Sequence, residues 1–225
     1  MVRVALALLL AIPALPQSKS LSLATADGLT LHNTSATPVT FKGKKALKVT
    51  ASGNAADAGP SRADHLALID GVEFSNGTIE ADLAGEPGSA AAEGARGFVG
   101  IAFRVQGERT KYDCFYLRPT NGRAEDQERR NHSAQYISHP EFTWSKLRQE
   151  TPSRYESYVD IQPAEWIHVK IQVEGTKARL YVNGASHPTL IVNDVKSGAL
   201  GKGAVALWFE GSTVAHFANV NITPK

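Results

Sequence analysis

The alternation of apolar and polar residues with a period of two is the feature that most constrains the fold of this chain. Within residues 166–174, four aliphatic residues occupy every second position: Ile167, Val169, Ile171 and Val173. Turn-forming pairs such as Asn76-Gly77 and Asn183-Gly184 separate segments of this kind at intervals of about 8–12 residues. No apolar pattern of helical period extends over three turns. We therefore predict an all-β fold, a two-sheet antiparallel β-sandwich, as a single domain over residues 20–225.

The amino terminus resembles a secretory signal. A single early cation, Arg3, precedes the apolar run Val4–Leu15, which is too short to cross a bilayer. We expect residues 1–17 to be a signal peptide and the mature protein to be secreted or periplasmic. The rest of the chain has no apolar run of comparable length, so we expect no transmembrane segment.

Charge and cysteine content exclude other classes. The formal net charge of the 225-residue chain is only +2, and the chain contains no basic run beyond Arg129-Arg130, so we expect no nucleic-acid partner. Cys114 is the only cysteine, which leaves no intramolecular disulfide. Its apolar surroundings, YDCFYL, favour a buried inert thiol over a nucleophile.

Two predicted strands precede the most polar part of the chain. In Gly97–Val105 the aliphatic residues share one face, which places Arg104 on the other. In Tyr112–Arg118 the alternation allows Tyr116 and Arg118 to lie on the outer face beside Arg104. Elsewhere, Asn33–Pro38 is predicted to be a turn and Tyr158–Ile161 a strand.

The stretch from residue 116 to residue 144 has the composition of a ligand-binding surface. It combines arginine, asparagine, glutamine and histidine side chains with aromatic rings, the groups that recognise hydroxyl-rich or carboxylate-bearing ligands. A solvated loop with no ligand is the alternative interpretation. The candidate ligand-binding residues are Arg104, Tyr116, Arg118, Asn121, Arg129, His132, Gln135, Tyr136 and Trp144.

Fewer residues suit catalysis or metal binding. If the protein is an enzyme, His132 and Glu156 are the candidate acid/base residues, and Arg118 or Arg129 would stabilise developing charge. The spacing of histidines and carboxylates matches no standard metal-ligand pattern, so we expect no metal site and no cofactor. A structural calcium ion at the rim of the sandwich stays open as an alternative.

Several segments between residues 74 and 222 resemble a known superfamily. They are F-x-N-G-x-I-E-x-D, G-x-x-G-I-A-F-R, E-W-I-H-V-K-I-x-V-x-G, A-R-L-Y-V-N-G and F-A-N-V-N-I. This order resembles the concanavalin-A-like lectins and glucanases, in particular the laminin-G-like jelly rolls and the 3-keto-disaccharide hydrolase domain. The resemblance implies a jelly roll that reads its ligand on a concave sheet face. It carries over no catalytic residues.

The sequence departs from two enzyme families of this fold. Family 16 glycoside hydrolases resemble it but use E-x-D-x-x-E, whereas Glu80 and Asp82 are followed by Gly85. The second carboxylate of a retaining pair is therefore missing, and charges on a solvated strand face are the simpler interpretation of Glu80 and Asp82. Jelly-roll alginate lyases have an R-x-E-x-R strand, a Q-x-H strand and a closing strand rich in Tyr and Lys. Here Arg123-Ala124-Glu125 ends in Gln127 instead of Arg, Gln135 is separated from His139, and the closing pattern is absent.

These observations favour a carbohydrate-binding protein that recognises a polysaccharide or oligosaccharide. The alternative is a glycan-cleaving enzyme, glycoside hydrolase-like or 3-keto-disaccharide hydrolase-like, that uses the same site. A protein-binding adhesion module is a third option, and it would need an exposed apolar patch. Residues 104–154 hold ten Lys and Arg against seven acids, so the predicted ligand is neutral or anionic.

Overall fold

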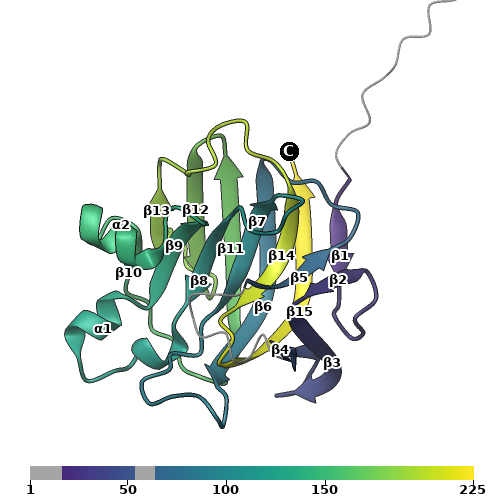
Figure 1. Cartoon of the computed structure of the whole chain (residues 1–225), viewed down its shortest axis with the longest axis horizontal. Helices are drawn as coiled ribbons and strands as arrows, with labels where there is room; N and C mark the ends of the chain where they lie inside the picture. The colour runs from purple at the N-terminus through teal and green to yellow at the C-terminus, as the bar shows by residue number, and fades with distance from the viewer. Residues whose placement is uncertain (1–16, 54–63) are drawn as a thin grey trace, which may run out of the picture.

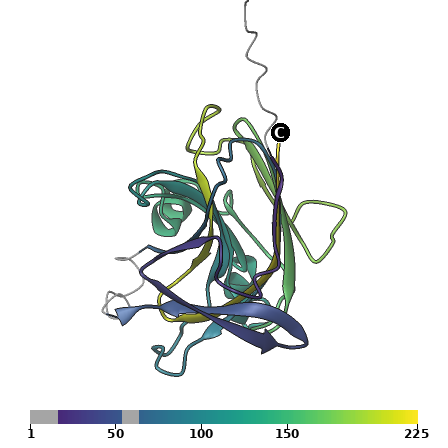
Figure 2. The same ribbon diagram turned by 90° about the vertical axis from the view of Figure 1, so that its right-hand side faces the viewer.

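A computed structural model describes residues 17–53 and 64–225, and it consists of two stacked antiparallel sheets (Figures 1 and 2). The predicted all-β sandwich is confirmed. The eight-stranded sheet has the order β13-β12-β11-β6-β15-β4-β3, with β1 also paired to β15. Its strands are β1 (Lys19–Leu21), β3 (Thr34–Phe41), β4 (Lys44–Ala51), β6 (Gly77–Pro87), β11 (Ile167–Glu174), β12 (Lys177–Val182), β13 (Leu190–Val192) and β15 (Thr213–Pro224).

The second sheet has seven strands in the order β10-β9-β8-β7-β14-β5-β2. These are β2 (Leu29–His32), β5 (His65–Ile69), β7 (Val99–Val105), β8 (Tyr112–Leu117), β9 (Ala134–His139), β10 (Glu156–Ser157) and β14 (Ala204–Phe209). The polar stretch singled out in the sequence therefore contributes a strand, β9, to this sheet. All neighbouring strands in the two sheets run antiparallel.

Short helices lie beside β9 and β10 at one edge of the molecule (Figure 1). They are the 3₁₀ turn η2 (Pro119–Asn121) and the helices α1 (Gln127–Asn131) and α2 (Trp144–Glu150). Asp126 caps α1 by accepting hydrogen bonds from two backbone N–H groups, and Thr143 caps α2 in the same way from Lys146 N. No helix in residues 17–53 or 64–225 is long and apolar enough to cross a membrane.

The core forms between the facing sides of the two sheets. On β11 the odd-numbered aliphatic residues are buried, whereas His168, Gln172 and Glu174 are exposed and Lys170 is half-buried, which confirms the predicted alternation. Cys114 is fully buried, and this burial raises the pKa of its thiol well above the usual value. The thiol is therefore inert, as predicted.

Two local predictions were wrong. Residues 34–38 belong to the strand β3 and do not form a turn. Proline has no backbone N–H to donate to a neighbouring strand. Pro38 is tolerated because β3 is the last strand of its sheet and has a neighbour on one side only. Residues 158–161 are not a strand, and the pairing with β9 is made two residues earlier by Glu156 and Ser157.

Ile171 allows a direct test of the core. It is 1% exposed and pairs with Leu180 on one side and Ile79 on the other. We expect Ile171→Ala to lower the free energy of unfolding by about 2–5 kcal/mol, because it leaves a cavity between the sheets. Gln172→Ala on the exposed face is the matched control, and denaturant unfolding should show a loss below about 0.5 kcal/mol for it. Equal losses for both variants would contradict the assignment of faces.

His216 makes the stability depend on pH. Its ring is 6% exposed and stacks on Phe41 with 3.8 Å between centroids. Burial, with the nearby Lys48 charge, lowers the pKa of His216 to about 4. Between about pH 6.5 and pH 4 the unfolded chain binds a proton at His216 that the folded chain does not yet accept. The free energy of unfolding therefore decreases as the pH falls from about 6.5 to about 4.

The expected loss at His216 is about 3 kcal/mol by pH 4. The measurement is the free energy of unfolding between pH 7 and pH 4 for the wild type and two variants. His216→Gln should lose this pH dependence, whereas His187→Gln, which changes an exposed histidine, should keep it. An unchanged pH dependence in His216→Gln would contradict the assignment.

Candidate functional site

The outer face of the seven-stranded sheet carries the candidate site. Strand register places Gly100, Tyr116, Gln135 and Glu156 in one row across β7, β8, β9 and β10. Residues paired across antiparallel strands point to the same side, so these side chains share the outer face. The row brings together residues 56 positions apart in the chain.

The same row continues on β14 with Trp208, which pairs with Gly100. The rings of Trp208 and Tyr116 stack across Gly100 with 4.9 Å between centroids. A Cβ at Gly100 would lie 2.6 Å from the Cβ of Tyr116, so glycine is required for this close approach. An aromatic floor therefore lies next to the polar end of the row.

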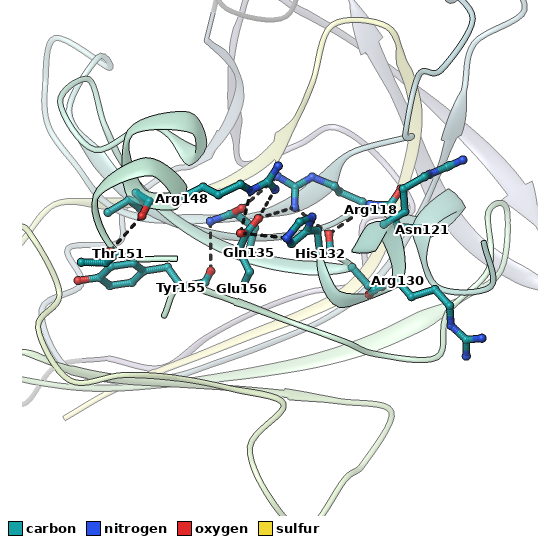
Figure 3. Close-up of polar contacts among 12 residues, drawn as sticks. Arg118, Asn121, Arg130, His132, Gln135, Arg148, Thr151, Tyr155 and Glu156 are labelled. Carbon is teal, nitrogen blue, oxygen red and sulfur yellow. Dashed lines mark hydrogen bonds and ion pairs between the residues drawn. The ribbon is translucent and has the colours of Figure 1, made fainter. Parts of the chain in front are cut away.

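Arg118 is the central cation of the site, and its side chain is 5% exposed. Its Nη2 donates to the hydroxyl of Tyr116 at 2.8 Å and to Oε1 of Gln135 at 3.0 Å. Its Nη1 donates to the backbone oxygen of His132 at 2.7 Å. The guanidinium therefore fixes the position of three other candidate residues, of which Gln135 and His132 are seen beside Arg118 in Figure 3.

Glu156 is the central anion, and its side chain is 2% exposed. Arg148 donates to both carboxylate oxygens, with Nε 2.9 Å from Oε2 and Nη2 on Oε1. Nη1 of Arg118 lies 3.5 Å from Oε1, and Nε2 of His132 lies 3.5 Å from Oε2. The carboxylate is thus shared between two guanidinium groups and an imidazole (Figure 3).

The ring of His132 is adapted to remain neutral. Burial lowers its pKa, and the nearby charges of Arg148 and Arg118 lower it further, which outweighs the opposing effect of Glu156. A neutral imidazole at pH 7 is able to accept a proton. By contrast, burial raises the pKa of Tyr116 to about 12, so its phenol keeps its proton.

A cavity of about 460 Å³ is lined by His132, Arg148 and Glu156, and Tyr158 also contributes to its wall. Above the two arginines, the indole of Trp144 is 43% exposed. Its ring centroid lies 4.9 Å from Cζ of Arg148 and 6.0 Å from Cζ of Arg118. An exposed indole on a polar site offers a stacking surface to a ligand ring.

Arg104 is placed away from this group. Its backbone φ of 56° and a register shift between β7 and β14 mark a β-bulge that ends the alternation of the strand. The fully buried side chain turns to the end of the sandwich, where it donates to the carbonyl oxygens of Ser75, Gly175 and Gly198. The predicted adjacency of Arg104 to Tyr116 and Arg118 is therefore wrong, because a bulge cannot be anticipated from a period-two pattern.

Tyr136 also lies apart from the polar group. It pairs with Phe115, and both side chains face the core. Its hydroxyl donates to Oδ1 of the buried Asp113 at 2.6 Å and accepts from the backbone N–H of Lys196 at 2.8 Å. These contacts describe a polar pair inside the sandwich, with no opening to the cavity beside His132.

The remaining candidates, Asn121 and Arg129, make hydrogen bonds to backbone oxygens near the site. Asn121 is 3% exposed and donates to the backbone oxygen of His132 at 3.4 Å. Arg129 lies on α1, and its Nη2 reaches the backbone oxygen of Thr120 at 3.5 Å. Both residues hold the loop that carries His132, and their assignment as ligand-binding residues stays a prediction.

Arg148 is the functional residue that sequence analysis missed. It lies four positions after Trp144 on α2, so both side chains point to the same side of the helix. Thr143 is a typical helix-capping residue, and this signal would have revealed the helix and the placement of Trp144 and Arg148 on one side of it. The prediction was missed because a seven-residue helix is too short to show an apolar period.

The described residues contain no group of three or more His, Cys, Asp or Glu side chains able to hold a metal ion. Several cations of the polar stretch have partners: Arg118 and Arg148 pair with Glu156, and Arg123 pairs with Asp160. The local positive charge is therefore partly neutralised within the protein.

The fold and the site together define a concanavalin-A-like jelly roll with a polar and aromatic site on one sheet face. The chain belongs to the family of 3-keto-α-glucoside-1,2-lyase-like domains, whose model matches residues 26–223. A search of curated proteins gave no match to this chain.

Solved structures of similar fold share little sequence with this chain. A protein of unknown function with a galectin-like fold from Bacillus subtilis has a TM-score of 0.57 at 10% identity, covering 91% of this chain and 94% of its own. The carbohydrate-binding module CBM66 from Bacillus subtilis has a TM-score of 0.55 at 15% identity, covering 87% and 96%. A putative glycosyl hydrolase from Parabacteroides distasonis has a TM-score of 0.51 at 13% identity, covering 92% and 94%. These likenesses establish the fold.

Proposed function

We propose that this protein binds a saccharide on the outer face of its seven-stranded sheet and cleaves a 3-keto-α-glucoside by elimination. One observation carries the proposal: a neutral imidazole, His132, lies beside the cation of Arg148 in a cavity, with Glu156 holding both. A base next to a fixed cation suits the removal of a proton adjacent to a carbonyl group. The family description supplies the substrate class.

The reaction follows from these roles. The C3 carbonyl acidifies the proton on C2, and His132 accepts that proton. Negative charge develops on the carbonyl oxygen, where the guanidinium of Arg148 stabilises it. The C1–C2 double bond then forms as the C1–O bond breaks, and the leaving oxygen takes a proton from water. The hydroxide so formed takes the proton held by His132, which returns the imidazole to its neutral form. Glu156 keeps the imidazole and the guanidinium in position and takes no part in bond formation.

A binding protein without catalysis is the second candidate. The observation that favours it is that both oxygens of Glu156 are engaged by arginine and histidine, so the charges of the site neutralise one another. The exposed indole of Trp144 would then serve as a stacking platform alone.

Incubation of methyl 3-keto-α-glucoside with the protein in deuterated water separates the two candidates. We expect NMR spectra to show methanol being released and deuterium at C2 of the remaining substrate, since proton removal precedes expulsion of the aglycone and the eliminated product has no proton on C2. Methyl α-glucoside, which has no carbonyl group, should remain unchanged. Binding of the keto-glucoside without exchange or release would contradict the enzymatic proposal and leave the binding function.

A further inference from the structure

The proposed elimination needs a proton donor as well as a base. In an α-glucoside the C2 proton and the C1 oxygen project from opposite faces of the sugar ring. An imidazole beside the C2 proton therefore cannot also reach the oxygen that leaves from C1. Because an alkoxide is a poor leaving group until its oxygen is protonated, a general acid elsewhere in the cavity wall would accelerate the reaction.

Tyr158 is the side chain of the cavity wall that can donate this proton. It follows β10 directly, two positions after Glu156, and lines the cavity together with His132 and Arg148. Tyr158 is 40% exposed, so its phenol is open to a ligand in the cavity. A phenol carries its proton at neutral pH and can donate it to an oxygen.

Arg130 holds the phenol of Tyr158 in place. Its Nη2 donates to the hydroxyl oxygen at 2.9 Å, and its Cζ lies 5.0 Å from the centroid of the phenol ring. Among the residues that the structure describes, none accepts the proton of this hydroxyl, which is therefore free for a ligand. The guanidinium also stabilises the negative charge that remains on the phenol oxygen once the proton has left.

Other groups of the cavity wall are less suited to this role. Glu128 lines the cavity but is exposed, and an exposed carboxylate has no proton to donate at neutral pH. Ser153 and Ser157 also line the cavity, but an aliphatic hydroxyl is a much weaker acid than a phenol. The hydroxyl of Ser157 moreover donates to the backbone oxygen of Tyr158 at 3.4 Å.

We propose that Tyr158 is the general acid that protonates the leaving glycosidic oxygen. This inference rests on the proposed elimination and gives the phenol the role that water has there. As the C1–O bond breaks, its electron pair passes to the leaving oxygen, which takes the phenol proton and departs as an alcohol. The phenolate stays beside Arg130. The proton that His132 took from C2 then returns to the phenolate through water, which restores both groups.

The test compares two leaving groups in the Tyr158→Phe variant. Methoxide needs a proton to leave, whereas 4-nitrophenolate leaves without one because its charge is spread over the ring and the nitro group. We expect Tyr158→Phe to lower kcat/KM for methyl 3-keto-α-glucoside by about 10²-fold or more, and that for 4-nitrophenyl 3-keto-α-glucoside by less than about threefold. Both rates are measured on one sample, so their ratio does not depend on the fraction of folded protein.

Exchange of the C2 proton provides a second readout for the same variant. His132 still removes this proton when the phenol is absent. In deuterated water Tyr158→Phe should therefore place deuterium at C2 of the methyl glycoside while it releases little methanol. Tyr181→Phe is the matched control, because its phenol also lies against a cation, with Nζ of Lys170 4.5 Å from the ring centroid, but on the eight-stranded sheet. It should behave as the wild type with both glycosides.

Two kinds of failure are distinguishable. If Tyr158→Phe loses activity equally with both glycosides, loses none, or keeps the wild-type ratio of exchange to release, Tyr158 is not the general acid, while the elimination by the wild type stands. A wild-type protein that neither exchanges the C2 proton nor releases methanol refutes the elimination and the role of Tyr158 with it.

Discussion

Replacing His132 by glutamine should reduce kcat/KM for methyl 3-keto-α-glucoside by about 10²- to 10⁴-fold, the usual contribution of a positioned general base. The amide of glutamine keeps polar contacts with Glu156 but cannot accept the proton from C2. Stability should change little, because the imidazole lies on the wall of the cavity and its ion-pair distance to Oε2 of Glu156 is 3.5 Å, longer than a hydrogen bond. Turnover measured by NMR and unfolding measured by denaturant separate the two effects.

The pH profile provides an independent check on His132. Because the pKa of His132 lies below its ordinary value, the ring is already neutral at pH 7. We expect kcat/KM to be flat around neutral pH and to fall in acid, with a midpoint below about 6.5. His187→Gln should retain both the rate and the profile. A variant His132→Gln that keeps more than half of the activity would remove His132 from the mechanism.

Glu156→Gln should lower the free energy of unfolding by about 3 kcal/mol, since removal of one partner of a buried ion pair leaves the other charge uncompensated. The uncompensated cation is Arg118, whose side chain is 5% exposed and whose other partners, Tyr116, Gln135 and the His132 carbonyl, are uncharged. Arg148 can turn to solvent more easily because its side chain is 32% exposed.

Glu165→Gln is the matched control for Glu156→Gln. Glu165 also pairs with a cation, Lys42, but their side chains are 51% and 42% exposed. Exposed pairs contribute about 0–1 kcal/mol, so the control should unfold close to the wild type. The charge of Glu156 also raises the pKa of His132, so NMR titration of Glu156→Gln should give a lower His132 pKa. Equal stability of the two variants would show that Glu156 is not needed to neutralise Arg118.

Five of the candidate site residues chosen from the sequence lie together in the structure. Tyr116, Arg118, His132, Gln135 and Trp144 were all selected by chemical type, and the structure brings them into one cluster. Local chemistry identified them because the residues that bind polar ligands differ in type from those that build a sheet. Arg104 and Tyr136 are of the same types, yet they have their partners inside the sandwich or at its end. Residue type alone therefore does not distinguish a polar residue of the site from one that stabilises the sandwich.

The sequence by itself determined the all-β class, the faces of strands such as β11, and the burial of Cys114. These depend on residues next to each other in the chain, because side chains alternate between the two faces of a strand. Only the tertiary structure decided which strands are neighbours, and so only it placed Glu156 against Arg118 and Asp64 against His139. Register between strands is set by contacts over the whole sandwich, and a single bulge at Arg104 redirects a side chain, so both lie beyond a local pattern.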